Sequence, residues 1–487
     1  MHQQQLIAVS EDSVQEPLPA NGVQVEHAVI IAAGHGLRFG NITLLRPKPL
    51  LEVLGLPLIE RAIRTARKVG IRKFTVITGH HAGMLESFLR QKRFADVTIH
   101  CVRNDRWQRS NGLSVLAAQG AVQEPFLLLM SDHLFEADIL RKLLAKPLAT
   151  GHCRLAVDFR VGNIFDLEDA TKVQVAEGRV ERIGKELDAY NAIDCGVFVC
   201  DRSLFEALES AVGKGNESLT DGIRELASEQ RMEAEDIGDS FWQDVDNKRD
   251  LEEGERRLLN TLTSRTDSWI THHVNRKISL LVTRRLAATH ITPNQITLFN
   301  FGLGLSAAAC MVNGGYFAVL LGALLFLLSS ILDGCDGEIA RLKFQQSRLG
   351  AWLDVATDNI THLALFGGIT VGLMRHSGSG FYLVPGGLLI LSALFSFILS
   401  VKAHKRLGQN GGPIFSESRL QDVTGTAKST RLARMLDRAA NRDFAYLLVF
   451  LAGIDQLDWF LWIAGLGAPI FGTLLYRALQ RSERSGS

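Results

Sequence analysis

The sequence predicts two domains: a Rossmann-like α/β domain with a mixed sheet, followed by an all-α membrane domain of about six transmembrane helices. Three observations support this. The 487 residues are too many for one ordinary core. Apolar runs are short and alternate with charge before about residue 290, and long afterwards. An apolar strand near residue 30 also leads into a glycine-rich turn, as in many α/β folds.

The expected divisions follow this change in composition. Residues 1–25 are polar and lack an apolar signal segment, so we expect a flexible leader. The α/β domain is expected at 26–255, amphipathic helices or a linker at 256–291, and the membrane domain at 292–480. Lys+Arg number 53 and Asp+Glu 52, which gives no argument for a nucleic-acid partner. The six cysteines form no CxxC pair, so neither a zinc site nor a disulfide framework is indicated.

The glycine-rich turn is the first candidate binding element. It contains Gly34 and Gly36, and Arg38 and Lys48 follow it. Backbone N–H groups in such a turn can hold a triphosphate, and the two cations can neutralise it. The alternative is an ordinary surface turn after a core strand.

Two acidic positions follow further along the α/β domain. Asp132 comes directly after the apolar run 126–130, and Asp246 ends the segment Trp-Gln-Asp-Val-Asp at 242–246. A carboxylate at the carboxyl end of a strand lies where α/β sheets bind ligands. The two aspartates are predicted to share Mg²⁺ on the phosphates of a nucleotide. Either one alone would more often be a turn residue.

These segments resemble the sugar-nucleotide pyrophosphorylase-type nucleotidyltransferases over roughly residues 25–255. The resemblance implies in-line attack of a substrate phosphate on the α-phosphate of an NTP, with release of pyrophosphate. It implies that Asp132 and Asp246 hold metal and that Lys48 binds phosphate. Ser131 stands where many relatives have glycine, which bears on the turn before Asp132 and not on the role of the carboxylate.

The same resemblance assigns residues to the base and to the second substrate. Asn104, Gly112 and Ser114 belong to the segment that often reads the base. Lys185, in Ile-Gly-Lys, would meet the phosphate of the second substrate. Asp194 lies on a late strand and is expected on the substrate side.

The second half contains apolar runs of membrane-spanning length, which is roughly 20 residues. They cover residues 296–312, 316–332, 353–374, 381–401 and 444–476. The last run is long enough for two passes and is broken near residues 455–458. About six spans are therefore expected.

Basic residues set the expected orientation. Arg276, Lys277, Arg284 and Arg285 lie among apolar residues, which predicts a helix at the membrane surface, or alternatively a solvated linker helix. A second basic cluster follows the fourth span; it comprises Lys402, Lys405 and Arg406. The positive-inside rule places both clusters, and the α/β domain, on the cytoplasmic side of the cell membrane. The second cluster is equally well interpreted as a site for an anionic acceptor.

The membrane half carries its own acidic motif, Asp-x-x-Asp-Gly-x-x-Ala-Arg, eight residues, then Gly-x3-Asp-x3-Asp. The aspartates of each pair share a helix face; they are Asp333, Asp336, Asp354 and Asp358. Carboxylates near lipid are costly unless neutralised, and one or two divalent cations would neutralise them. Arg341 offers a cationic fork for phosphate, and Asp358 is the candidate base for an acceptor hydroxyl. The alternative is that these aspartates only cap helices.

The motif resembles that of the CDP-alcohol phosphotransferases, with every fixed position filled. The resemblance covers roughly residues 292–477 and implies a six-helix membrane protein, commonly a homodimer, that depends on Mg²⁺ or Mn²⁺. It implies that the four aspartates hold metal, with Asp358 as the base. It also implies that Gly337, Ala340 and Arg341 contact the CDP group.

The order of the two halves suggests that the first makes a CDP-alcohol from CTP and a phosphoalcohol, and the second uses it. This arrangement resembles the bifunctional inositol-1-phosphate cytidylyltransferase and di-inositol-phosphate-phosphate synthase enzymes. The resemblance implies that CDP-inositol forms and transfers phosphoinositol to a second inositol 1-phosphate, which releases CMP. One alternative keeps both reactions with phosphocholine, phosphoethanolamine or another phosphoalcohol and a lipid acceptor. Another makes the first half a non-catalytic regulatory domain.

Overall fold

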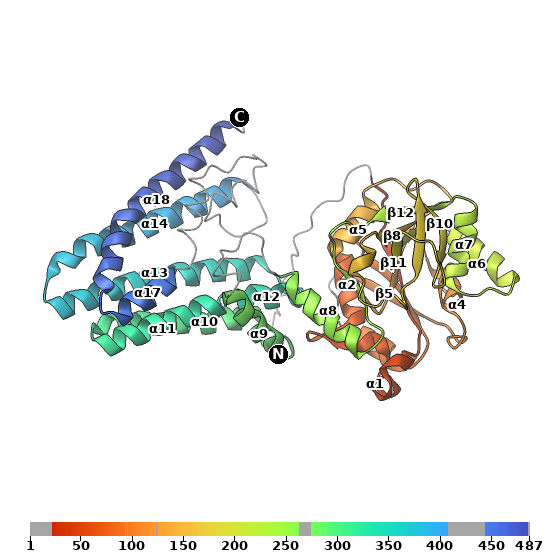
Figure 1. The fold of residues 1–487 in the computed structure, drawn as a ribbon, viewed down its shortest axis with the longest axis horizontal. Coiled ribbons are helices and arrows are strands. Elements are labelled where there is room, and N and C mark those ends of the chain that lie inside the picture. Colours follow the sequence, from red (N-terminus) through yellow and green to blue (C-terminus); the bar gives the residue numbers. More distant parts are fainter. Residues whose placement is uncertain are drawn as a thin grey trace, which may run out of the picture. The chain divides into compact units, whose positions relative to one another are not determined.

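The computed structural model describes residues 22–92, 94, 96–122, 125–262, 274–407 and 444–485. The chain forms two compact units that divide between Thr261 and Leu262. Figure 1 shows the elements of each unit. Each unit is described by itself.

In the first unit, nine of the described strands form one sheet in the order β5-β4-β1-β6-β11-β8-β12-β10-β9. The strands are β1 (His27–Ala32), β4 (Lys73–Thr78), β5 (Thr98–Arg103), β6 (Phe126–Met130), β8 (Cys153–Asp158), β9 (Lys172–Ala176), β10 (Arg179–Gly184), β11 (Ala192–Cys200) and β12 (Met232–Asp236). Strand β1 is parallel to β4 and β6, whereas β11 is antiparallel to β6 and β8. The predicted α/β domain with a mixed sheet is therefore confirmed.

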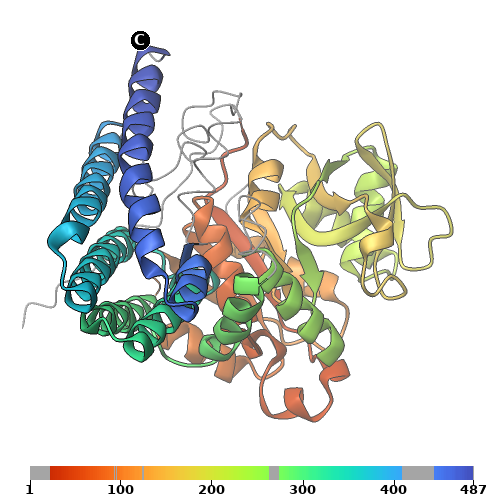
Figure 2. The same ribbon diagram turned by 60° about the vertical axis from the view of Figure 1, so that its left-hand side comes forward.

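Helices cover both faces of this sheet, as Figures 1 and 2 show. The helices of the unit are α1 (Asn41–Leu45), α2 (Leu58–Lys68), α3 (Ala82–Gln91), α4 (Asn111–Leu116), α5 (Ala137–Leu144), α6 (Ser203–Gly213), α7 (Leu219–Ser228) and α8 (Lys248–Asn260). One core joins α2, α3 and α5 to the sheet, and a second joins α4, α6 and α7 to the opposite face. Strands that are covered on both faces have continuously apolar sequences, as β6 has.

Two short ribbons complete the first unit. β2 (Glu52–Val53) pairs with β3 (Leu56–Pro57), and β7 (His133–Phe135) pairs with β13 (Trp242–Asp244). The second ribbon joins two segments that are far apart in the sequence. It lies beside the carboxyl end of β6, where Asp132 follows the strand.

The second unit is helical. Its described helices are α9 (Arg276–Ala287), α10 (Pro293–Asn313), α11 (Tyr316–Leu332), α12 (Gly334–Leu342), α13 (Arg348–Ser377), α14 (Leu383–Leu407), α17 (Phe444–Gly453) and α18 (Leu457–Ser485). Helix α10 packs on α11 and α13, and α14 packs on α18. Thr292 and Gln295 form a capping box at the start of α10, and Pro293 occupies its first turn.

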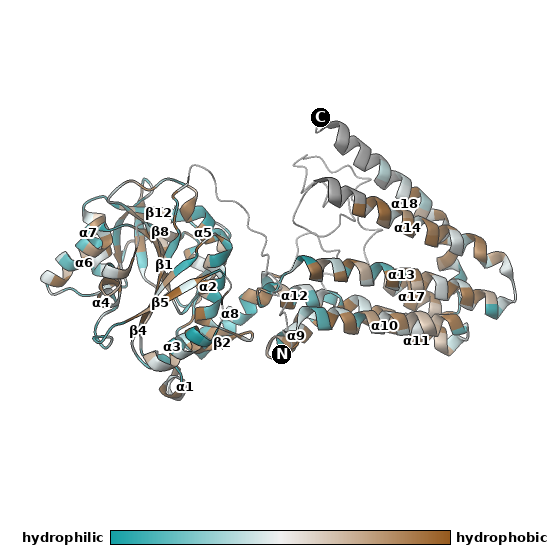
Figure 3. Ribbon diagram, turned by 180° about the vertical axis from the view of Figure 1, so that it is seen from behind, coloured by the Kyte–Doolittle hydropathy of each residue, from teal (hydrophilic) through white to brown (hydrophobic). Residues whose placement is uncertain are grey.

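The predicted apolar runs are helical, and the last one is interrupted at residues 454–456, between α17 and α18. Among the described residues, three helical segments are long and apolar enough to cross a membrane: Pro293–Asn313, Tyr316–Leu342 and Gly380–Leu399. Two shorter apolar segments are Phe444–Gly453 and Leu457–Ile470. Figure 3 shows how strongly apolar these helices are, and large apolar side chains are exposed on them, such as Phe317, Leu391 and Ile463. The number of passes, six, stays a prediction.

Candidate active sites

The glycine-rich turn after β1 has the tight geometry that its residues predict. Gly36 has φ +68°, and a Cβ there would come within 3.0 Å of the Cβ of Lys48. The hydroxyl of Thr43 donates to the carbonyl of Gly36 at 2.9 Å. Only glycine accepts both this left-handed backbone and this close approach. The turn therefore brings Lys48 and Arg38 to the carboxyl end of β1.

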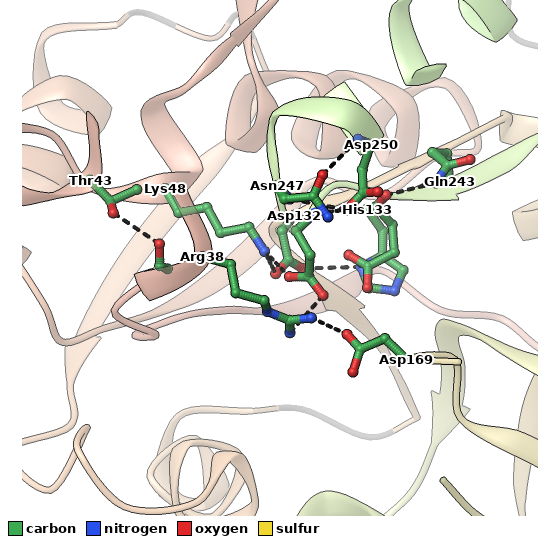
Figure 4. A network of polar contacts seen from close by, with 12 residues as sticks. Arg38, Thr43, Lys48, Asp132, His133, Asp169, Gln243, Asn247 and Asp250 are labelled. Carbon is green, nitrogen blue, oxygen red and sulfur yellow. Dashed lines mark hydrogen bonds and ion pairs between the residues drawn. The ribbon is translucent and has the colours of Figure 1, made fainter. Parts of the chain in front are cut away.

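Lys48 joins the two predicted aspartates, and Figure 4 shows Lys48 beside Asp132. Its Nζ donates to Asp132 at 2.5 Å and to Asp246 at 2.6 Å, and the residue is only 6% exposed. Burial by itself would lower the pKa of Lys48, but the charges of Asp132, Asp244 and Asp246 outweigh burial and raise it. The lysine is thus a fixed cation at the edge of the sheet.

Asp132 also lies in a group with metal-ligand spacing. Ligand atoms of Asp132, His133 and Asp244 all lie within 4.8 Å of one another. The β7–β13 pairing produces this group, because it sets Asp244 directly opposite His133. Two carboxylates and an imidazole suit a divalent cation. Asp246, the predicted second ligand, instead contacts Lys48 and Arg38, the latter at 2.8 Å.

Burial and neighbouring charges shift the pKa values within this group of three residues. Burial raises the pKa of Asp244 to about 7. Burial would lower the pKa of His133, but the neighbouring Asp244 and Asp132 raise it to about 9. A bound cation would favour the ionised carboxylates and the neutral ring, because both changes supply lone pairs.

The predicted substrate residues Lys185 and Asp194 line one cavity together with Arg38. Its lining includes Arg38, Asp132, Lys185, Asp194 and Asp246. The loop before β9 also contributes, since Asp169 pairs with Arg38 and accepts from Lys185 Nζ at 2.5 Å (Figure 4 shows the Arg38 pair).

Asp194 occupies an irregular position of β11. The pairing of β11 with β8 shifts register after Asp194, and its carboxylate accepts from the backbone N–H of Gly196 at 2.7 Å. Burial raises the pKa of Asp194 to about 6. A bulge beside a site re-aims a side chain, here toward the cavity that Asp194 lines.

The predicted base-reading residues make contacts within the protein. Asn104 and Ser114 are buried, and the Asn104 amide donates to the Ser114 hydroxyl at 2.9 Å. Gly112 lies so close to the backbone of Glu217 that a Cβ would be 2.4 Å from its carbonyl oxygen. Asn111, next to Gly112, lines the cavity. The structure thus shows these residues shaping the loop, and contact with a base stays a prediction.

The helical unit brings three of its four predicted aspartates together. Carboxylate oxygens of Asp333, Asp354 and Asp358 lie within 4.8 Å of one another. Asp333 lies between α11 and α12, and the other two lie one turn apart on α13. Three carboxylates in a mostly apolar unit fit a divalent cation with oxygen ligands.

The fourth aspartate has partners in the protein. Asp336 accepts from the hydroxyl of Thr297 at 2.5 Å and from the N–H of Gly337 at 2.5 Å. Gly337 also faces Arg341, whose Nη1 would lie 3.2 Å from a Cβ at position 337. The small residue therefore leaves room beside the guanidinium, as the motif predicts for a phosphate-bearing ligand.

A buried acid links the motif to the juxtamembrane helix. Glu338 is fully buried on α12 and accepts from Arg276, Ser279 and Thr283 of α9 at 2.8, 2.9 and 2.6 Å. The opposite face of α9 exposes Lys277. Helix α9 is therefore amphipathic in an unusual sense, because its inward face is polar and matched to one carboxylate.

Sequence reasoning missed several of these residues. His133 directly follows Asp132, and Asp244 precedes Asp246 by two residues. Asp244 ends β13 and Asp246 lies just beyond it, so the closeness of both to predicted site residues was a usable signal. Asp169 and Glu338 carry no local signal. The predicted cluster of Lys402, Lys405 and Arg406 falls on the last turns of α14, and its side chains lie outside the described residues.

The two halves of the chain match two different protein families. Residues 28–230 match the MobA-like NTP transferase domain, and residues 290–414 match the CDP-alcohol phosphatidyltransferase family. A protein of Aquifex aeolicus, named bifunctional IPC transferase and DIPP synthase, is 35% identical over 72% of this chain and 78% of its own length. Two proteins of the same name also match. The one from Rubrobacter xylanophilus is 35% identical over 74% of this chain and 81% of its own length. The one from Archaeoglobus fulgidus is 28% identical over 91% of this chain and 82% of its own length. An inositol-1-phosphate CTP transferase structure from T. maritima aligns with 48% of this chain and 97% of its own at 24% identity, TM-score 0.44.

Proposed function

The chain belongs to the family of bifunctional IPC transferases and DIPP synthases, and from that premise we propose that it catalyses two consecutive reactions. In the first unit, CTP and inositol 1-phosphate give CDP-inositol and pyrophosphate. In the second unit, CDP-inositol transfers phosphoinositol to a second inositol 1-phosphate and releases CMP. The observation that carries the proposal is that one chain holds two separate phosphate-directed sites, one around Lys48 and one around Asp358.

The first site supplies charge where an NTP would need it. Lys48 and Arg38 neutralise the triphosphate, and the Gly34–Gly36 turn offers backbone N–H groups. A phosphate oxygen of inositol 1-phosphate, held by Lys185, attacks the α-phosphorus of CTP. The bond from that phosphorus to the β-phosphate oxygen breaks, and pyrophosphate leaves. Asp194 accepts hydrogen bonds from ring hydroxyls, and Asn104, Gly112 and Ser114 form the base-side loop.

Divalent cations fit both sites. In the first unit, Asp132, with His133 and Asp244 or with the predicted Asp246, would hold Mg²⁺. In the second unit, Asp333, Asp354 and Asp358 would hold Mg²⁺ or Mn²⁺, with Asp336 as the predicted fourth ligand. When bound, such a cation would neutralise the phosphate oxygens and stabilise the leaving phosphate.

The second site then uses the product of the first. Gly337, Ala340 and Arg341 hold the CDP group, and Asp358 takes the proton of the acceptor hydroxyl. The hydroxyl oxygen attacks the phosphorus that bears inositol. The bond from this phosphorus to CMP breaks, so phosphoinositol passes to the acceptor and CMP leaves with the electron pair.

The membrane arrangement is part of the proposal. The second unit spans the cytoplasmic membrane with six helices, and exposed apolar side chains such as Phe317 and Ile463 face lipid. The basic residues of α9 and of residues 402–406 support a cytoplasmic position of the first unit. Two copies form a homodimer, and Lys402, Lys405 and Arg406 attract the anionic acceptor.

The test separates the two reactions on the full chain in detergent. With CTP, Mg²⁺ and inositol 1-phosphate, the wild type is expected to release pyrophosphate and CMP, with the products identified by mass spectrometry. Asp132→Ala is expected to stop pyrophosphate release but still consume supplied CDP-inositol. Asp358→Asn is expected to accumulate CDP-inositol, with the second rate lowered about 10²–10⁴-fold by loss of the base. Absence of pyrophosphate release by the wild type would overturn the proposal.

A further inference from the structure

The helical unit contains three polar groups that neither the motif nor the proposed chemistry uses. They are Asn300 on α10, Ser330 on α11 and His362 on α13, and all three line the cavity that contains the aspartates. They come from three helices, and α10 packs against both of the others. His362 follows Asp358 by one helical turn, so it faces the same side of α13.

Two of these groups carry a buried polar atom without a hydrogen bond among the described residues. The amide nitrogen of Asn300 donates to Asp333 at 3.4 Å. Asn300 is 9% exposed, and its Oδ1 is buried with no hydrogen bond among the described residues. The hydroxyl of Ser330 is likewise buried and unbonded within the described chain. The ring of His362 makes aromatic contacts with Phe326, Phe444 and Phe366, at centroid distances of 5.9, 5.8 and 6.1 Å.

Buried polar groups in folded proteins are normally satisfied, so two unsatisfied oxygens that face one cavity, Asn300 Oδ1 and Ser330 Oγ, indicate a polar ligand. The half-buried ring of His362 lines the same cavity. The residues that line the cavity indicate the kind of polar ligand. Among the described residues that line the cavity there is no lysine or arginine, which argues against a phosphate group at this point. An amide oxygen, a hydroxyl and an imidazole instead match hydroxyl groups, which both donate and accept. The aromatic side chains of Phe301 and Phe326 line the same cavity and suit the C–H faces of a ring.

We infer that Asn300, Ser330 and His362 form a polyol subsite that holds ring hydroxyls of an inositol group beside the three aspartates. This rests on the proposed function and deepens it. The inositol belongs either to the donor CDP-inositol or to the acceptor inositol 1-phosphate, and the subsite distinguishes polyols from alcohols that lack additional hydroxyls. These residues bind and orient, and the proton and the phosphate move at the aspartates.

The test uses substitutions that remove only the polar atoms. His362→Phe fits the surrounding aromatic cluster, and Ser330→Ala removes one oxygen. The KM for CDP-inositol is measured at saturating inositol 1-phosphate, and the KM for inositol 1-phosphate at saturating CDP-inositol, with the full chain in detergent. The control is His376→Phe, an exposed position near the far end of the same helix.

Both variants are expected to raise the same KM, by at least tenfold for His362→Phe. A rise for the donor assigns the subsite to its inositol, and a rise for the acceptor assigns it to the acceptor. His362→Gln should recover part of the loss, since an amide still bonds to hydroxyls, and His376→Phe should change neither constant. Unchanged KM values in both His362→Phe and Ser330→Ala would mean that the cavity holds only water and would overturn the inference.

Failure of the proposed function gives a different result. In that case the wild type releases no CMP from CDP-inositol. A screen of other CDP-alcohols then identifies the substrate, and the same two KM measurements with that substrate decide whether the subsite exists.

Discussion

Replacing Glu338 with alanine will detach α9 from the helix that carries the second motif. Glu338 is fully buried and accepts hydrogen bonds from Arg276, Ser279 and Thr283 at 2.6–2.9 Å. Its removal leaves a cation and two hydroxyls without their acceptor in a buried position. Removing one partner of a buried ion pair costs about 3–5 kcal/mol.

This cost has a measurable size. For a unit of roughly 200 residues, each kcal/mol lowers the melting temperature by about 2–4 °C, so the expected shift is on the order of 10 °C. Glu338→Gln keeps the shape and part of the bonding, and its cost is about 1–2 kcal/mol. Thermal unfolding of the full chain in detergent gives the comparison. Lys277→Met on the exposed face of α9 is the control. Its free energy of unfolding is expected to change by no more than about 0.5 kcal/mol.

The two activities of the chain supply a second readout. Helix α12 carries Gly337 and Arg341, so Glu338→Ala is expected to slow phosphoinositol transfer while CDP-inositol synthesis proceeds at the wild-type rate. The double variant with Arg276→Met also removes the cation that Glu338 pairs with and should recover part of the stability. The reasoning is refuted if Glu338→Ala has the same melting temperature as the Lys277→Met control, or if the rates of both reactions fall equally.

Three further predictions concern the remaining charges. Lys48→Met removes the cation between Asp132 and Asp246, so kcat/KM for CTP should fall about 10²–10³-fold, while conversion of supplied CDP-inositol is unchanged; equal loss of both would contradict the assignment. Because burial raises the pKa of Asp194 to about 6, its carboxylate is ionised above pH 6 and neutral below, so the KM for inositol 1-phosphate in the first reaction should rise as pH falls from 7 to 5. The Asp194→Asn variant should have a high KM for inositol 1-phosphate that does not change with pH. If its KM changes with pH as that of the wild type does, Asp194 is not the source of the pH dependence. EDTA should stop both reactions and Mg²⁺ restore them, with Mg²⁺ also raising the melting temperature; activity that persists in EDTA would exclude a required cation.

The sequence was sufficient where a property depends on local geometry. The spacing of Asp354 and Asp358 places them on one face of a helix whatever surrounds it, because an α-helix turns about 100° per residue. The apolar run of β6 predicts a buried strand, so Asp132 had to lie at its end. Gly36 reflects a left-handed turn that other residues avoid. The two-domain organisation follows from hydropathy, since a membrane and water select different compositions.

The tertiary structure decided which of these residues meet. Asp244 reaches His133 only because β13 pairs with β7, and that pairing joins segments more than one hundred residues apart. Asp336 shares a motif with Asp333 but bonds to Thr297, because α10 packs beside α12. Glu338 meets its three partners because α9 packs against α12. Periodicity within one element determines which side of it a residue faces, whereas long-range packing determines what that side contacts.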